Sequence, residues 1–219
     1  MKQIGYKIQP IAQGFCYKPP AGCFGYASVF LVCDENKTIL FDTGSYCIRN
    51  EIVNLIKTRH IDKVVISHLH FDHCSNLDLF VNTDTEILMS RTEYECYFKN
   101  KERDQDLFSY FNFIHKHLNI NFVSGNEMVS SNCKIIATPG HTKGHISLEI
   151  FDGSKTYILC GDAIKSKKEK SNLNKNTNAY DYEMTVQTRQ KILTNYKHIL
   201  FGHDAYKKKL KLRRFWWKK

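Results

Sequence analysis

Three histidines and an aspartate fall within six positions of the segment HLHFDH, directly after the apolar run VVIS. These side chains are His68, His70, Asp72 and His73. So many polar groups would be unfavourable in a core unless each had a partner. Imidazole nitrogens and carboxylate oxygens are ligands of divalent transition metals, so the segment predicts a metal site.

Further candidate ligands follow other apolar runs. His141 comes after KIIATPG, Asp162 after YILCG, and His203 after ILFG. Because strand ends along one rim of a sheet scaffold can converge, these residues can share a site with HLHFDH. Seven ligands exceed the four of a tetrahedral zinc site, so the set predicts two metal ions that share a carboxylate. Nitrogen and oxygen ligands suit zinc, manganese, iron or cobalt, with zinc as the default, and the lack of a cysteine-rich shell favours catalysis.

The elements that must position these ligands are both strands and helices. We expect strands at 24–33, 38–42, 63–67, 86–90, 119–123, 133–138, 146–151, 156–160 and 198–201. We expect helices at 48–59, from Thr92 (which has capping-box spacing to Glu95), at about 104–117 and at about 182–195. The polar segment 165–179 is predicted to be an exposed, mobile loop. Two strand-rich halves separated by helices predict an α/β protein with sheets packed face to face and helices outside.

Length and composition fit one sizeable domain, with 219 residues of which 42% are hydrophobic. The N-terminal residues lack the apolar region of a secretory signal, and no run of about 18 apolar residues exists. We therefore expect a cytoplasmic protein without a transmembrane segment. The eight cysteines are scattered singly without a C-x-x-C pair, which predicts reduced thiols that lie mostly in the core.

The net charge of +10 is concentrated in two segments. Residues 165–175 hold five lysines against one glutamate, and residues 207–219 hold eight lysines and arginines with no acidic residue. We expect a domain at 1–206 and a basic, aromatic C-terminal tail at 207–219. The tail has three interpretations: a solvated charge run, a surface for nucleic acid or an anionic membrane, or aromatic side chains packed near a substrate entrance.

Taken in order, HLHFDH, TPGH, GD and the late GH resemble the ligand pattern of the metallo-β-lactamase superfamily. FDTG at 41–44 stands where that superfamily has a short N-terminal aspartate motif. Within the superfamily the chain is most similar to the N-acyl-homoserine lactonase group. The similar pieces are HLHFDH, RTEYE at 91–95, TPGHTKGHISLEIF at 138–151, GDA at 161–163 and FGHD at 201–204. For the 1–206 domain, the resemblance implies a hydrolase with an αββα sandwich of two packed mixed β-sheets and helices on the outer faces.

The resemblance also implies roles for individual residues. One ion would be held by His68, His70 and His141, and the other by Asp72, His73 and His203. Asp162 would bridge the two ions, and a hydroxide between them would attack the substrate carbonyl. Asp72 would shuttle a proton, so Asp72 and Asp162 are the expected catalytic residues. His145, Cys74 and Cys160 are expected to lie outside the ligand set.

Lys165 stands three residues after Asp162, where these lactonases carry a tyrosine that supports the oxyanion. A lysine can also stabilise an oxyanion, and it can equally bind a carboxylate or a phosphate. The leading hypothesis is a monomeric or homodimeric hydrolase that opens an ester, with an N-acyl-homoserine lactone as the first choice. The alternatives are a glyoxalase II-like thioester hydrolase, an RNA or DNA phosphodiesterase that uses the basic loop and tail, and a non-catalytic metal-binding or interaction protein.

Overall fold

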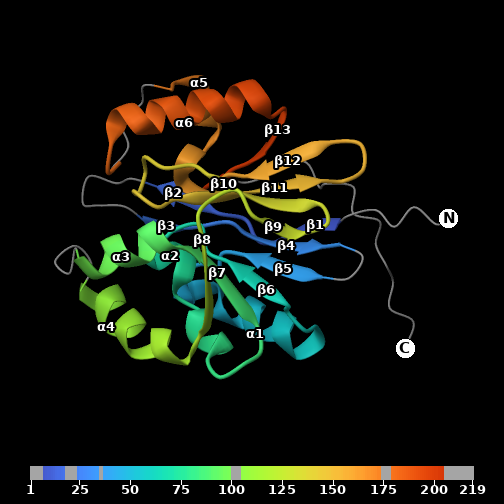
Figure 1. Cartoon of the computed structure of the whole chain (residues 1–219), viewed down its shortest axis with the longest axis vertical. Helices are drawn as coiled ribbons and strands as arrows, with labels where there is room; N and C mark the ends of the chain where they lie inside the picture. Colours follow the sequence, from blue (N-terminus) through green and yellow to red (C-terminus); the bar gives the residue numbers. More distant parts are fainter. Residues whose placement is uncertain (1–6, 18–23, 35–36, 100–104, 174–178, 205–219) are drawn as a thin grey trace.

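The computed structural model describes residues 7–17, 24–34, 37–99, 105–173 and 179–204. Two mixed β-sheets lie face to face, and helices cover the outer face of each sheet (Figure 1). The predicted αββα sandwich is therefore confirmed. The proposed boundary between the 1–206 domain and the 207–219 tail lies outside the described residues.

The larger sheet has six strands, of which the last four in sheet order run parallel to one another. In sheet order they are β1 (Lys7–Ala12), β4 (Val29–Cys33), β5 (Thr38–Phe41), β6 (Lys63–Val65), β7 (Glu86–Ser90) and β8 (Asn119–Val123). Parallel strands place their carboxyl ends at the same edge of the sheet. The residues that follow β5, β6 and β7 therefore come close together.

The smaller sheet has five strands, with one parallel pair between β12 and β13. In sheet order they are β13 (His198–Leu200), β12 (Thr156–Leu159), β11 (Ile146–Phe151), β10 (Cys133–Ala137) and β9 (Met128–Ser130). A separate hairpin pairs β2 (Phe15–Tyr17) with β3 (Phe24–Tyr26).

Helices on the two outer faces come from different parts of the chain (Figure 1). Those of the first half are η1 (Tyr46–Ile48), α1 (Arg49–Thr58), α2 (Phe71–Cys74), η2 (Leu77–Phe80), α3 (Arg91–Lys99), α4 (Gln105–Ile114) and η3 (His115–His117). Those of the second half are η4 (Gly161–Ile164), α5 (Lys167–Ser171) and α6 (Tyr182–Asn195). The helices α1 and α4 pack on the larger sheet, and α6 packs on the smaller one.

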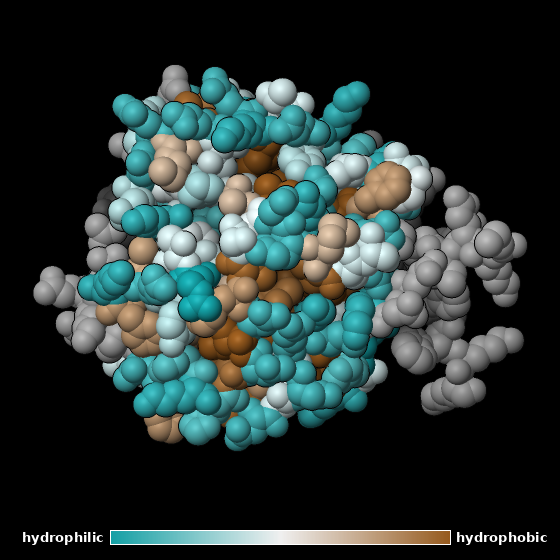
Figure 2. Space-filling model, in the orientation of Figure 1, coloured by the Kyte–Doolittle hydropathy of each residue, from teal (hydrophilic) through white to brown (hydrophobic). Residues whose placement is uncertain are grey.

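Both faces of the larger sheet are buried, because helices cover one and the second sheet covers the other. Successive side chains of a strand point to opposite faces. In β4, Val29 and Leu31 accordingly pack under the helices, whereas Phe30 and Val32 pack between the sheets. Figure 2 shows hydrophobic surface in the middle of one face, in the band between the two sheets, with hydrophilic surface above and below it.

The predicted strand at 24–33 is wrong in one respect, because it is two strands rather than one. The backbone leaves the strand path at Ser28, whose N–H donates to the carbonyl of Gly202 at 2.6 Å. The hydroxyl of Ser28 also accepts a hydrogen bond from the N–H of Gly14. Partners this distant in sequence leave no local signal. The strands β1, β2 and β9 were not predicted either.

The segment 165–179 is also different from the expectation of an exposed, mobile loop. Its described part contains the short helix α5, and Glu169 in that helix is only 3% exposed. The carboxylate of Glu169 pairs with Arg189 at 2.9 Å, and Arg189 is fully buried on α6. The polar composition of the segment did not predict this pair. The two charged residues of a buried ion pair need not be neighbours in sequence.

Helix ends differ from the predictions by small amounts. The helix expected from Thr92 begins at Arg91, and the hydroxyl of Ser90, not Thr92, accepts the N–H of Glu93. Among the described residues, no helix has the length and apolar character needed to cross a bilayer. Of the seven described cysteines, only Cys74, Cys133 and Cys160 are buried, so the expectation that most lie in the core is wrong.

Candidate metal centre

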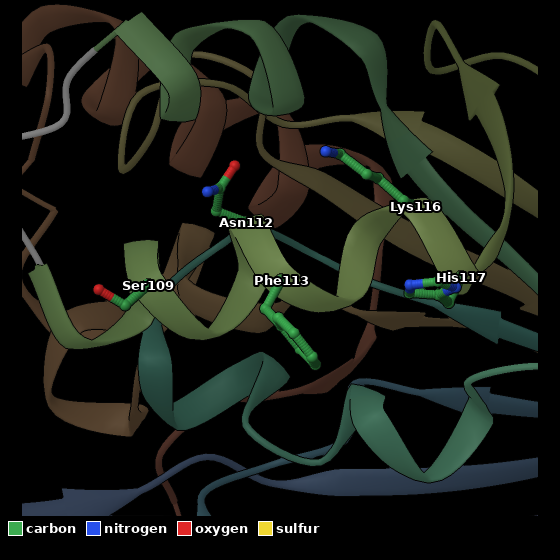
Figure 3. A pocket seen from close by; sticks show the side chains of 5 residues that line it. All are labelled: Ser109, Asn112, Phe113, Lys116 and His117. Carbon is green, nitrogen blue, oxygen red and sulfur yellow. The ribbon is translucent and has the colours of Figure 1, made fainter.

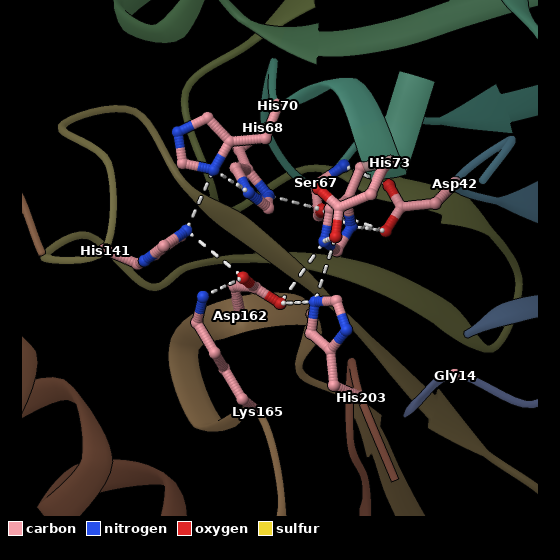
Figure 4. A network of polar contacts seen from close by, with 12 residues as sticks. Gly14, Asp42, Ser67, His68, His70, His73, His141, Asp162, Lys165 and His203 are labelled. Carbon is pink, nitrogen blue, oxygen red and sulfur yellow. Dashed lines mark hydrogen bonds and ion pairs between the residues drawn. The ribbon is translucent and has the colours of Figure 1, made fainter. Parts of the chain in front are cut away.

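The predicted ligands lie at the ends of strands from both sheets. The segment with His68, His70, Asp72 and His73 follows β6 of the larger sheet. The other three candidates follow strands of the smaller sheet: His141 follows β10, Asp162 follows β12, and His203 follows β13. Packing of the two sheets brings all seven residues into one cluster, and Figure 4 labels six of them, all but Asp72.

The cluster contains two groups of possible donors, and within each group the donor atoms lie within 4.8 Å of one another. The first group is His68, His70, His141 and Asp162, and the second is Asp72, His73 and His203. In the first group, Nδ1 of His70 lies 2.9 Å from Nε2 of His68 and 3.0 Å from Nε2 of His141. Three imidazole nitrogens therefore point at one another.

Asp162 lies between the two groups (Figure 4). Its Oδ2 is 3.2 Å from Nε2 of His141 in the first group. Its Oδ1 is 3.2 Å from Nε2 of His73 and 3.0 Å from Nε2 of His203 in the second group. One carboxylate oxygen thus faces each group, which is the geometry that a bridging ligand requires.

The donor atoms fit divalent metal ions better than they fit one another. Nε2 of His73 and Oδ1 of Asp162 are buried and make no hydrogen bond within the described part of the chain, despite their short separation. Buried polar atoms in native proteins usually have a partner, so unpaired ones call for an explanation. A cation between the converging nitrogens and oxygens would satisfy them, and nitrogen and oxygen donors suit zinc and similar ions.

Burial and neighbouring charges shift the pKa values of the histidines in the two groups in opposite directions. Burial lowers the pKa of His68 and His141 well below 6.5 and that of His70 to about 4, so these imidazoles are neutral and have free lone pairs. Burial also disfavours charge on His73 and His203, but neighbouring carboxylates, led by Asp162, raise the pKa of both. A metal at the second group must therefore displace protons.

Asp42 supports the second group and was not identified as a functional residue from sequence. Its Oδ2 lies 2.7 Å from Nδ1 of His73, which leaves Nε2 of that ring directed at the cluster. Asp42 also accepts hydrogen bonds from the N–H and the hydroxyl of Ser67. Its φ of +60° is in the left-handed region, which is uncommon for residues other than glycine and which concentrates at functional sites. The FDTG motif contains this aspartate and was the available signal.

His145 lies outside both groups, but it supports the cluster. Its Nε2 accepts the backbone N–H of Asp162 at 3.1 Å, and its Nδ1 lies 2.8 Å from the hydroxyl of Thr138. Both ring nitrogens are therefore occupied, and the side chain is 1% exposed. Cys74 and Cys160 are buried and are not part of either group.

Lys165 directs its ammonium into the cluster, where Nζ lies 2.8 Å from Oδ2 of Asp162 (Figure 4). Its backbone is held on both sides. The N–H donates to the carboxylate of Glu169 at 2.8 Å, and the carbonyl accepts from the N–H of His203 at 2.7 Å. Because Arg189 fixes Glu169, the buried pair of α5 and α6 holds the segment that carries Lys165.

A surface hollow elsewhere on the molecule lacks the donor residues of this cluster. It is lined by Ser109, Asn112, Phe113, Lys116 and His117, from α4 and η3 (Figure 3). Phe113 is largely exposed there. None of these residues belongs to either donor group.

An αββα sandwich with histidine and aspartate donors at its strand ends defines a class of metal-binding proteins. Residues 24–203 match the family described as the metallo-beta-lactamase superfamily, and the chain belongs to it.

Known relatives agree with this assignment. The chain is 28% identical over 169 residues to an N-acyl homoserine lactonase of Bacillus thuringiensis, and the match covers 73% of the chain but only 64% of that lactonase. It is also 28% identical to a probable metallo-hydrolase of Methanocaldococcus jannaschii, with 78% of the chain and 74% of the relative covered. A crystal structure of a quorum-quenching N-acyl homoserine lactone lactonase superposes with a TM-score of 0.71 at 25% identity, covering 91% of the chain and 92% of that structure.

Proposed function

We propose that this protein is a dinuclear metal-dependent hydrolase that opens an ester carbonyl, and that its substrate is a lactone of the N-acyl-homoserine type. The observation that carries the proposal is the position of Asp162, with one carboxylate oxygen facing each donor group. The ions are two divalent metals, with zinc as the first choice. Such an activity would make the protein a quorum-quenching enzyme, and its proposed location is the cytoplasm.

Metal ions bound at this site would supply hydroxide from water near neutral pH and would polarise the substrate carbonyl. The protein's own groups do the remaining work. Addition of hydroxide forms a C–O bond, and cleavage of the ester C–O bond releases an alkoxide that needs a proton. Asp72 is 32% exposed and has Oδ2 3.2 Å from Nε2 of His203, so it can carry a proton from the attacking oxygen to the alkoxide.

Lys165 is the second group with a direct chemical role. Its ammonium lies at the edge of the cluster and can stabilise the negative oxygen that develops on the carbonyl. The tyrosine of similar lactonases would do so by a neutral hydrogen bond. The full charge also attracts anionic substrates, which keeps a phosphodiester as the competing candidate, because Lys167, Lys168 and Lys170 follow on α5.

A substrate panel tests the proposal. N-acyl-homoserine lactones, a glutathione thioester and labelled RNA should be assayed with zinc and with manganese, at 50 and 200 mM salt. We expect lactone hydrolysis whose kcat/KM barely changes with salt, since a neutral lactone engages few charges. A nucleic acid held through six or more phosphates would lose about a thousandfold in affinity over this range.

Lys165→Tyr sharpens the comparison, because it restores the hydroxyl of the lactonase group and removes the charge. The variant should retain or gain lactonase activity and lose activity on anionic substrates. RNA cleavage that is salt-sensitive and lost in Lys165→Tyr, without any lactone hydrolysis, would replace the lactonase proposal with a phosphodiesterase.

A further inference from the structure

Glu93, on the first turn of α3, is a buried carboxylate that the proposed chemistry does not use. It is 5% exposed, and among the described residues no lysine, arginine or histidine forms an ion pair with it. Its oxygens instead accept two backbone hydrogen bonds, from the N–H of Leu69 at 3.0 Å and from the N–H of Gly144 at 3.1 Å. Burial of a carboxylate is costly, so its retention calls for an explanation.

The two donors belong to the loops that carry the three histidines of the first group of candidate ligands. Leu69 lies between His68 and His70, and Gly144 lies three residues after His141. These loops follow strands of different sheets, and one carboxylate joins them. His73 in the second group has a different support, the carboxylate of Asp42. Glu93 is therefore placed to act on the first group specifically.

Two local features show that the contact between Glu93 and the two loops is close and specific. A Cβ on Gly144 would lie 2.1 Å from the backbone nitrogen of Glu93, so only glycine permits the approach of the loop. Ser90 and Glu93 have the spacing of a capping box, in which the glutamate would turn back to its own helix end. The hydroxyl of Ser90 does accept the N–H of Glu93, but the carboxylate points away from the helix to the two loops.

We propose that Glu93 is a positioning residue for the first metal: its carboxylate holds the backbones of the Leu69 and Gly144 loops at the separation at which His68, His70 and His141 can share one ion. The inference rests on the two-metal site proposed above. A helix N-terminus also favours an acidic residue, but that effect alone would not require contact with two loops.

Glu93→Gln tests the inference while preserving the shape of the side chain. The amide has one oxygen and one NH2 group, so it can accept from only one of the two N–H groups and opposes the other. Zinc competition titrations should show one class of site weakened by about 10–100-fold, as is typical when a supporting partner of a metal ligand is lost. The weakened class should be the one that His141→Ala weakens, and the class that His203→Ala weakens should be unchanged.

Glu95→Gln is the matched control, because Glu95 lies on the same helix and is exposed. It should leave both classes unchanged. Gly144→Ala provides a second route, since it keeps the carboxylate but forces the loop and α3 apart, and it should weaken the same class as Glu93→Gln. If Glu93→Gln does not fold, this variant decides the question.

Hydrogen exchange in the metal-free protein tests the role of Glu93 independently of the proposed metal site. In the metal-free protein, the amide protons of Leu69 and Gly144 should exchange faster in Glu93→Gln than in the wild type, whereas amides in α6 should not change. A wild type that binds two metals and a folded Glu93→Gln with unchanged affinity in both classes would overturn the role of Glu93 alone. Equal weakening of both classes would also overturn it. A wild type that binds no metal would overturn the proposed function itself.

Discussion

At the scale of single residues, the two aspartates of the cluster are placed for different tasks. Asp162 is 2% exposed and lies between the donor groups, whereas the side chain of Asp72 is 32% exposed and belongs to the second group only. A buried carboxylate shared by two ions can be replaced less easily than one at the solvent edge. We therefore expect the two residues to differ in what their loss does to metal binding.

Asp162→Asn should reduce the bound metal below two ions per chain and abolish turnover, because the amide is uncharged and has only one oxygen. Asp72→Asn should leave metal at the first group and lower kcat by about 10²–10⁴-fold, the range typical for loss of a proton-transferring group. Elemental analysis and steady-state kinetics on a lactone measure the two effects. Wild-type turnover in both variants would show that these roles are wrongly assigned.

At the scale of elements, α6 holds the segments that follow β10 and β12. The hydroxyl of Thr188 donates to the carbonyl of Pro139 at 2.6 Å, in the loop that leads to His141. The next residue, Arg189, donates to the carbonyl of Ala163 and pairs with Glu169. One face of α6 thus fixes both loops of the smaller sheet that carry candidate ligands.

Arg189→Met should destabilise the protein by about 3–5 kcal/mol, because Glu169 remains buried without a counter-ion. Urea unfolding measures the change in free energy of unfolding. Lys191→Met is the control on the same helix, since Lys191 is exposed, and it should change stability by less than about 0.5 kcal/mol. Adding Glu169→Leu to Arg189→Met should recover part of the loss, and no recovery would contradict the ion-pair explanation.

At the scale of the whole molecule, each candidate metal would join the two sheets. The first group combines His68 and His70 from the larger sheet with His141 and Asp162 from the smaller, and the second group also draws on both. Metal binding is therefore coupled to the packing of the sandwich. Ions that bind only the folded state stabilise it by about 2.7 kcal/mol per site at a free concentration one hundred times the Kd.

Chelation should accordingly lower Tm, and the effect should grow as pH rises from 6 to 8. The pKa values of His73 and His203 are raised in the folded metal-free protein, so their charged forms stabilise it below the unfolded pKa near 6.5. That contribution is lost as pH rises through the folded pKa values, whereas metal binding strengthens because fewer protons must be displaced. Thermal melts with zinc and with chelator at both pH values test this. A difference in Tm that shrinks with pH would contradict the pKa directions.

Much of the fold follows from local sequence signals. The strands that carry the ligands were predicted to within a few residues, because apolar runs flanked by polar turns are contiguous in the chain. Each of the seven candidate ligands follows such an apolar run, and for that reason we predicted that they converge on one site. The structure brings them together. Their roles as metal ligands stay a prediction, as does the 207–219 tail.

Only the tertiary structure decided which partners the buried polar groups have. The sequence by itself determined that HLHFDH and three later strand ends carry histidines and aspartates that are candidate metal donors, because these residues and the strands before them are adjacent in the chain. It did not show that Glu93 faces Leu69 and Gly144, that Glu169 pairs with Arg189, or that Ser28 meets Gly202. Each of these contacts joins residues that are 20 or more positions apart, and a buried charge or N–H finds such a partner only after the sheets have packed.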